Sequence, residues 1–281
     1  MAQRPRGVML KARVLTAIVL LAGLLSALLL LPAAGWLGLC ALVCGGAAWE
    51  WGGLAGFGTR PRAILALSFG LICLSAGFWL GLAADRPLAA SQLGGFYLVS
   101  AIFWIAVIPL WLTRKWKLAS SLAAILIGAV VLLPPALALA HLRLIDPRVL
   151  LAAMAIVWVA DIAAYFSGRA FGRHKLAPSI SPGKTWEGAV GAAVGVLIFG
   201  FALSVSLNVP TPAGWGGFAF VLVGYTAVSI IGDLFESLLK RQAGLKDSGN
   251  LLPGHGGILD RIDSLTSTLP IAGLAALWWA R

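Results

Sequence analysis

Four polar side chains near the end of the sequence are spaced so that they would share one face of a helix. Asp233, Glu236, Ser237 and Lys240 follow one another at intervals of three, one and three residues, which places them in one stripe along a helix surface. The residues between them are apolar, so the polar stripe would face a bundle interior or a watery cavity. An ion pair between Glu236 and Lys240 would explain those two residues and leaves Asp233 unexplained. The stripe therefore predicts part of a functional site.

A second group of charges and glycines follows this stripe. Its members are Lys246, Asp247, Gly254, His255, Gly256, Gly257, Asp260, Arg261 and Asp263. Glycines let the backbone approach a ligand closely and expose its N–H groups, and two aspartates three residues apart share a helix face. Carboxylates beside basic residues suit a Mg²⁺ ion that carries a polyphosphate, because Mg²⁺ prefers a few carboxylates together with substrate oxygens.

An earlier segment carries matching chemistry. Asp161 and Tyr165 are four residues apart, so they would share a helix face, and a basic, hydroxyl-rich stretch follows them. The Gly-Lys-Thr run at 183–185 is similar to the end of a P-loop, but Pro178 occupies the place of the first glycine and no strand is predicted before it, which excludes that motif. What remains is a loop that leads into a helix N-terminus, a favourable place for phosphate.

The acidic residues of the whole chain concentrate in these two segments. There are ten, and all except Glu50, Asp85 and Asp146 lie in the segments or in the helix ends that feed them. Carboxylates are costly in a bilayer, and those at helix ends inside a bundle usually mark function. This concentration predicts one site built from both segments.

The composition indicates which elements must position that site. Of 281 residues, 60% are hydrophobic and 11% are charged, whereas soluble domains have roughly 25% charged residues. Many continuous apolar runs reach the length of about 20 residues that a membrane-spanning helix needs. We therefore predict an all-α, polytopic membrane protein with about nine spans, at residues 14–32, 35–55, 63–83, 95–113, 118–140, 149–166, 188–207, 216–236 and 264–280.

The basic residues predict the orientation of these spans. With a cytoplasmic N-terminus, most of the 21 Lys and Arg residues fall on the inner side, and only Arg86, Arg143, Arg148 and Arg281 fall outside. The C-terminus would then lie outside, and both long polar loops, 167–187 and 237–263, would be cytoplasmic. The net charge of +11 is spread over several short loops, which argues against nucleic-acid binding and for contact with anionic membrane lipids.

Two regions follow from this arrangement, working as one functional unit. Residues 1–140 would form about five N-terminal spans, and residues 141–281 would form a catalytic membrane region that carries both cytoplasmic loops.

The polar segments resemble one known family. The pattern from Ser237 to Asp263, with Lys-Arg at 240–241, Lys-Asp at 246–247, Leu-Pro-Gly-His-Gly-Gly-Ile at 252–258 and Asp-Arg-Ile-Asp at 260–263, closely resembles the signature of phosphatidate cytidylyltransferases, also called CDP-diacylglycerol synthases. The Ser-Pro-Gly-Lys-Thr-x-Glu-Gly run at 181–188 is similar to that family as well. The N-terminal spans are similar only in hydropathy and number.

The resemblance implies a reaction and a set of site residues. CTP and phosphatidic acid would give CDP-diacylglycerol and pyrophosphate at an inner, cytoplasmic membrane, in a homodimer that uses Mg²⁺, with two ions expected. In the family two aspartates hold metal, and these correspond to Asp233 and Asp260; Asp161, Asp247 and Asp263 would be further ligands or would support them.

The remaining candidates would bind substrates. Phosphates would be held by Lys240, Arg241, Lys246 and Arg261. The nucleotide or its phosphates would contact Ser179, Ser181, Lys184 and Thr185. The surrounding site would include Tyr165, Arg169, Glu187, Ser237, Gly256 and Gly257. We expect His255 to bind phosphate or fix the turn rather than to act as a base.

Two alternative functions stay open at this point. A CTP-dependent polyprenol or dolichol kinase would also handle CTP and a lipid in a polytopic bundle. An ion-coupled transporter would use intramembrane carboxylates, but most spans carry no polar residue near their middle, and Glu50 is the main exception.

Overall fold

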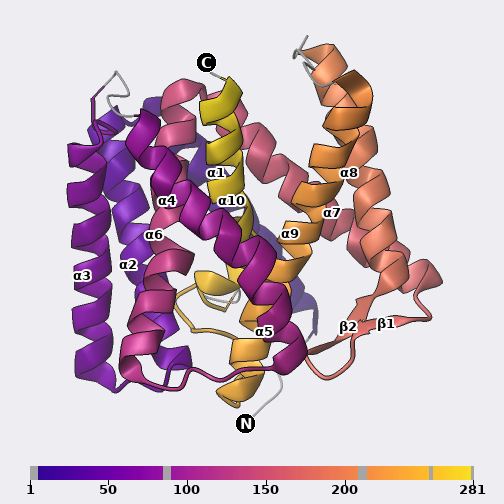
Figure 1. The fold of residues 1–281 in the computed structure, drawn as a ribbon. Helices are drawn as coiled ribbons and strands as arrows, with labels where there is room; N and C mark the ends of the chain where they lie inside the picture. Colours follow the sequence, from indigo (N-terminus) through magenta and orange to yellow (C-terminus); the bar gives the residue numbers. More distant parts are fainter. Residues whose placement is uncertain (1–5, 85–89, 208–213, 253–255, 280–281) are drawn as a thin grey trace.

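A computed structural model of the chain describes residues 6–84, 90–207, 214–252 and 256–279, and most residues within these ranges are helical. The elements follow in the order α1 (Arg6–Leu30), α2 (Ala33–Leu54), α3 (Thr59–Trp79), α4 (Ala90–Ile102), η1 (Phe103–Val107), α5 (Ile108–Arg114), α6 (Ser121–Ile145), α7 (Pro147–Phe171), β1 (Lys175–Ala177), β2 (Ser181–Thr185), α8 (Trp186–Ser206), α9 (Gly214–Gln242) and α10 (Leu259–Trp279). The predicted all-α membrane fold is confirmed (Figure 1).

Seven helical segments among the described residues are long and apolar enough to cross a membrane, judged by length and composition. They are α2, α3, the continuous segment from Gln92 to Arg114, α6, α7, α8 and α9. The chain is therefore a membrane protein. The apolar part of α1 is shorter, and α10 does not meet the same measure, so the count of nine spans stays a prediction.

Helix boundaries differ from the predicted spans at the polar ends. The charge-free stretch from residue 188 to 232 is split as predicted, because α8 ends at Ser206 and α9 begins at Gly214. However, α9 continues to Gln242 and α7 to Phe171. Since both helices extend past the predicted spans, Arg169 and Arg241, which fell in the predicted loops, stand on helix ends instead.

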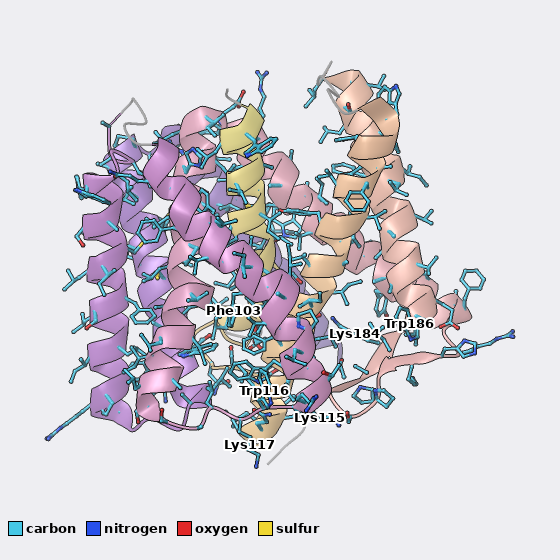
Figure 2. The ribbon with its side chains drawn as sticks, viewed as in Figure 1. Phe103, Lys115, Trp116, Lys117, Lys184 and Trp186 are labelled. Atoms are coloured by element: carbon cyan, nitrogen blue, oxygen red, sulfur yellow. The ribbon has the colours of Figure 1, made fainter. Side chains whose placement is uncertain are left out.

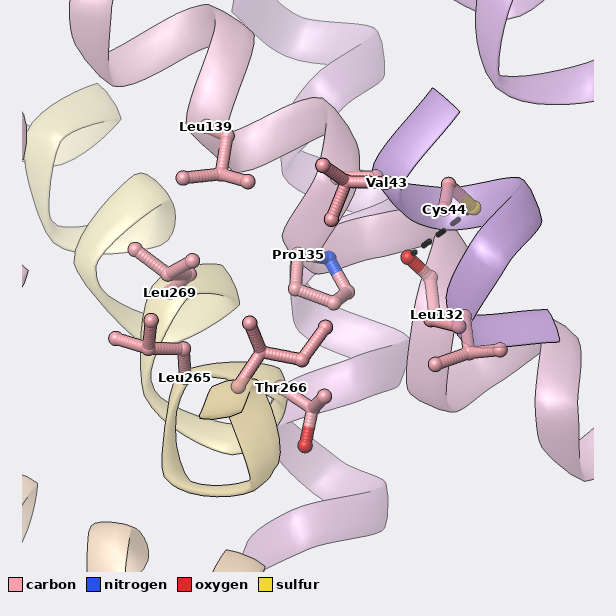
Figure 3. A pocket seen from close by; sticks show the side chains of 11 residues that line it. Val43, Cys44, Leu132, Pro135, Leu139, Leu265, Thr266 and Leu269 are labelled. Atoms are coloured by element: carbon pink, nitrogen blue, oxygen red, sulfur yellow. Dashed lines mark hydrogen bonds between the residues drawn. The ribbon is translucent and has the colours of Figure 1, made fainter. Parts of the chain in front are cut away.

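The N-terminal helices pack directly on α10. Helices α2, α6 and α10 meet at a small apolar cavity of about 30 Å³, lined by residues such as Cys44, Leu132 and Leu269 (Figure 3). The Cys44 thiol points to the Leu132 carbonyl oxygen at 3.8 Å, beside Pro135 within α6. Because residues of α10 line the cavity together with α2 and α6, the first half of the chain packs against the helix that carries Asp260 and Asp263.

Helices α7 and α8 form a closely packed pair on the other side of α9 (Figure 1). A glycine on each helix allows the close approach: a Cβ added at Gly188 would lie 3.5 Å from the Gly168 Cα atom. The two helices can therefore place polar side chains from both backbones around one space.

A short antiparallel hairpin, β1–β2, connects α7 to α8, and the sequence did not predict it. Lys175 pairs with Thr185, and Ala177 pairs with Ser181. The Ser-Pro-Gly-Lys-Thr run lacks the alternation and β-branched content that usually signal a strand. The hairpin forms because its ends are held: the Trp186 N–H donates to the His174 carbonyl at 2.9 Å.

Candidate active site

A cavity of about 520 Å³ lies between α7, α8, α9 and the hairpin. Its polar lining comes from Asp161, Tyr165, Arg169, Ser181, Lys184, Thr185 and Asp233, and its apolar lining includes Ala160, Ala192 and Ile230. The structure thus brings together residues from the two segments singled out in the sequence. Lys184 lies at the end of the bundle where Lys115 and Lys117 also lie (Figure 2).

An ion pair crosses this cavity. Lys184 Nζ on β2 lies 2.5 Å from Asp233 Oδ2 on α9, and each side chain retains about a quarter of its exposure, 25% and 27%. Ser237, one turn further along α9, donates its hydroxyl to Asp233 Oδ1 at 3.2 Å. The pair joins the hairpin to α9, and its residual exposure leaves both groups accessible to a ligand.

Asp161 on α7 and Asp233 on α9 line this cavity, and Asp263 on α10 lies beside it, since a Cβ atom added at Gly232 would lie 2.8 Å from the Asp263 carbonyl oxygen. Asp233 acts electrostatically on both Asp161 and Asp263, and Asp161 acts on Asp263. Lys184 attracts the carboxyl groups of both Asp161 and Asp263. In this conformation the described part of the chain contains no group of three His, Cys, Asp or Glu side chains placed tightly enough to hold an ion alone. Carboxyl oxygens from more than one helix, close to a lysine, suit a cation that also takes oxygens from a substrate.

Asp260 lies in a separate cluster. Its Oδ1 accepts from Lys240 Nζ at 2.7 Å, and its Oδ2 accepts from the backbone N–H groups of Ser248, at 2.9 Å, and Gly257, at 2.8 Å. Lys240 also lies 3.1 Å from Glu236 Oε1, and only 13% of its side chain is exposed. Asp260 therefore fastens the loop before α10 to α9, and Lys240 is occupied by two carboxylates.

The rest of the 237–263 segment presents charges outward. Arg241, Lys246, Asp247 and Arg261 are exposed. Arg241 donates to the Leu245 carbonyl at 3.4 Å. The predicted role of His255 falls outside the described residues.

The four candidates in and directly after the hairpin lie in different positions. Ser179 is exposed at the turn and does not line the cavity, whereas Ser181 does. Thr185 caps α8, since its hydroxyl accepts from the Gly188 N–H at 3.1 Å. Glu187 accepts from His174, with 2.7 Å between Oε1 and Nδ1, so it closes the base of the hairpin away from Asp233.

Tyr165 and Arg169 line the cavity side by side on α7. Arg169 donates to the Tyr165 hydroxyl at 3.2 Å, and both side chains are exposed. Arg169 is the second cation at this rim of the cavity and is free of any carboxylate among the ion pairs of the described residues.

Residues 11–278, nearly the full chain, match the model of the cytidylyltransferase family. The chain belongs to the cytidylyltransferase family. Two similar relatives confirm this over almost their whole length. A phosphatidate cytidylyltransferase of Pseudomonas aeruginosa is 39% identical, covering 97% of this chain and 98% of the relative. One of Haemophilus influenzae is 38% identical, covering 93% and 96%.

A third relative is more similar in sequence, but only over part of its length. A phosphatidate cytidylyltransferase of Brucella suis is 56% identical over 113 residues, or 40% of this chain and 41% of the relative. The family resemblance seen in the polar motifs is confirmed, and it extends through the N-terminal helices of this cytidylyltransferase-family chain.

Sequence reasoning missed Glu50, which lies on α2. It is completely buried and accepts three hydrogen bonds, from the Ser248 hydroxyl at 3.0 Å and the N–H groups of Ile258 at 3.0 Å and Leu259 at 2.8 Å. The available signal was its position, since it is an acidic residue inside a predicted span. An acidic residue inside a span also fits an ion-coupled transporter, and we used it for that alternative. The sequence alone does not show that residue 50 contacts residue 258.

Proposed function

We propose that this chain transfers CMP from CTP to phosphatidic acid and releases pyrophosphate, giving CDP-diacylglycerol for membrane phospholipid synthesis. The observation that carries the proposal is the cavity between α7, α8 and α9, where Lys184, Arg169, Asp161 and Asp233 surround one space. The family membership and the printed names of the two nearly full-length relatives support the choice of substrates.

The chemistry needs positioning and charge neutralisation more than a base. The ionised phosphate of phosphatidic acid is itself the nucleophile; it attacks the α-phosphorus of CTP in line, and the bond to the leaving pyrophosphate breaks. Lys184 and Arg169 would neutralise phosphate oxygens during this step. The apolar part of the lining, with Ala160, Ala192 and Ile230, accommodates the start of the acyl chains.

We propose that Mg²⁺ is the cofactor and that Asp161, Asp233 and Asp263 hold it. The grouping of Asp161 and Asp233 in one cavity and the polyphosphate charge of CTP both favour a divalent cation. When bound, the ion would neutralise charge on the phosphates and hold them in place. Asp260, first expected to be a direct ligand, already accepts three hydrogen bonds, so we assign it to holding the loop.

The location and assembly also belong to the proposal. We place the chain in the cytoplasmic membrane, with the N-terminus and the hairpin inside and the C-terminus outside, because of the distribution of Lys and Arg. The hairpin and the outer end of α10 lie at opposite ends of the bundle (Figure 1). A homodimer is proposed from the family resemblance alone, and light scattering of the purified protein in detergent tests it.

The activity is tested with the purified full chain in detergent. Pyrophosphate release should require CTP, phosphatidic acid and Mg²⁺ together, and chromatography should identify the lipid product as CDP-diacylglycerol. Diacylglycerol in place of phosphatidic acid should give no release. Pyrophosphate release that ignores phosphatidic acid, or no release across a range of lipids and metals, would exclude the proposed reaction. The transporter alternative loses its main support, since Glu50 is fully occupied by hydrogen bonds to the loop.

A further inference from the structure

We propose that Glu50, in the N-terminal half of the chain, is a positioning residue for CMP transfer. It would hold the loop before α10, and through that loop the first turn of α10, in the arrangement that the reaction requires. This inference rests on the proposed function for its kinetic consequence, whereas its structural part can be tested without activity.

All hydrogen bonds of the Glu50 side chain go to the loop before α10 and to the first residue of α10. Both carboxylate oxygens are used: Oε1 accepts from the Ile258 N–H, and Oε2 accepts from the Leu259 N–H and the Ser248 hydroxyl. The two amides belong to the start of α10, where unpaired N–H groups and the helix dipole attract negative charge. Among the ion pairs of the described residues none involves Glu50, so the loop itself stabilises this buried carboxylate.

Two glycines of the polar motif are explained by this carboxylate. A Cβ atom added at Gly249 or at Gly257 would lie 2.7 Å from the Glu50 Cδ atom, too close for any real side chain. The sequence pattern had suggested that Gly257 gives room for a ligand. At 249 and 257 the room is taken by Glu50, so the motif and a residue almost 200 positions earlier form one packed unit.

A short chain of contacts leads from Glu50 to the candidate site. Glu50 fixes Ser248 and Leu259, and the Ser248 N–H in turn donates to Asp260, which also binds Lys240 of α9. Asp263 follows one turn later on α10, and its backbone packs against α9 beside Asp233, since a Cβ atom added at Gly232 would lie 2.8 Å from the Asp263 carbonyl oxygen. Because helices transmit rigid shifts, a displaced first turn of α10 would move Asp263 relative to Asp233.

Glu50→Gln is the sharpest variant, because the amide keeps the shape but offers only one oxygen to the two backbone N–H groups. We expect kcat to fall about ten- to a hundredfold, as for the loss of a buried charge-assisted hydrogen bond, while KM for CTP changes by less than about threefold. Glu50→Ala should be lower still. The backbone amides of Ile258 and Leu259 should exchange hydrogen faster in Glu50→Gln than in the wild-type protein.

The matched control is Trp36→Phe, at the opposite end of α2 and about 21 Å away along the helix. Trp36 is also buried, and its Nε1 donates to the Leu139 carbonyl at 3.1 Å. The control loses a buried hydrogen bond of the same helix and should leave kcat and the exchange of the Ile258 amide unchanged. If Trp36→Phe lowers kcat as much as Glu50→Gln, the effect is general destabilisation and the proposal is wrong.

A double-mutant cycle covers the case in which Glu50→Ala does not fold. Ser248→Ala alone should lower kcat a few-fold, and in the Glu50→Gln background it should add almost nothing, because the shared contact is already weakened. Fully additive effects, or wild-type kcat and exchange in Glu50→Gln, would overturn the proposal. An inactive wild-type protein would instead count against the proposed function, and the exchange experiment would still test the positioning.

Discussion

Lys184 on the hairpin and Asp233 on α9 form a 2.5 Å ion pair across the cavity. They are separated by 49 positions in the sequence, yet this contact joins the two polar segments into one site. Asp161 lines the same cavity as this ion pair, so the lysine lies among carboxyl groups from α7 and α9. The pair therefore links the proposed phosphate-binding side to the proposed metal-binding side.

Replacing Lys184 tests the phosphate-binding side. Lys184→Met keeps the length of the side chain and removes its charge, so turnover should fall about a hundred- to a thousandfold, the usual effect of removing one group that stabilises developing charge. Initial rates with purified protein measure this. Lys175→Ala, an exposed lysine on β1 that does not line the cavity, is the control and should retain the wild-type rate.

Replacing the aspartates separates the proposed metal ligands from the loop anchor. Asp233→Asn should abolish measurable turnover, because it removes a ligand charge and the partner of Lys184. Asp263→Asn should raise the Mg²⁺ concentration needed for half-maximal rate about tenfold or more. Asp260→Asn should lower kcat with the Mg²⁺ requirement unchanged, since Asp260 holds Lys240 and two backbone amides.

Mg²⁺ titrations of the two variants decide between the assignments. A raised Mg²⁺ requirement in Asp260→Asn, together with a normal one in Asp263→Asn, would restore Asp260 as the ligand and contradict our interpretation of the geometry.

The contact between Glu187 and His174 at the base of the hairpin gives a prediction that does not depend on activity. Glu187→Gln weakens the contact with His174, so trypsin should cleave after Arg173 or Lys175 about two- to fivefold faster, in proportion to the open population. Mass spectrometry of the fragments measures the rate at each site. Cleavage in the exposed Lys115–Lys117 segment is the internal control, and an equal increase there would point to global loosening instead.

The cap of α8 gives a prediction on stability. Thr185→Ala removes the hydroxyl that accepts from the Gly188 N–H and should cost about 1 kcal/mol, lowering Tm by about 2–4 °C. Thr185→Ser keeps the hydroxyl and should unfold near the wild-type temperature. Tryptophan fluorescence during heating in detergent measures both. An equal Tm for the alanine and serine variants would show that the cap contributes nothing.

The sequence predicted the membrane class, the split between α8 and α9, and the polar stripe of α9, because apolar length and helical spacing are local properties. It also predicted that two distant segments form one site, because most acidic residues of the chain lie in these two segments and carboxylates in a membrane usually mark function. The metal assignment of Asp260 came from the family resemblance, and its hydrogen bonds to Lys240, Ser248 and Gly257 depend on a loop fold that spacing does not reveal.

Two features could not be read from the sequence for physical reasons. The hairpin is stabilised by contacts at its ends, the Trp186 N–H to His174 and Glu187 to His174, rather than by strand propensity. The role of Glu50 depends on a contact across more than 190 positions, which appears only when α2 and α10 pack together.

The most direct test of the central claim uses CTP labelled with ³²P at either the α- or the γ-phosphate, with phosphatidic acid, Mg²⁺ and the purified protein. CMP transfer predicts that α-label enters the lipid fraction and that γ-label leaves as pyrophosphate. Lipid that carries γ-label but no α-label would contradict CMP transfer and identify a CTP-dependent lipid kinase.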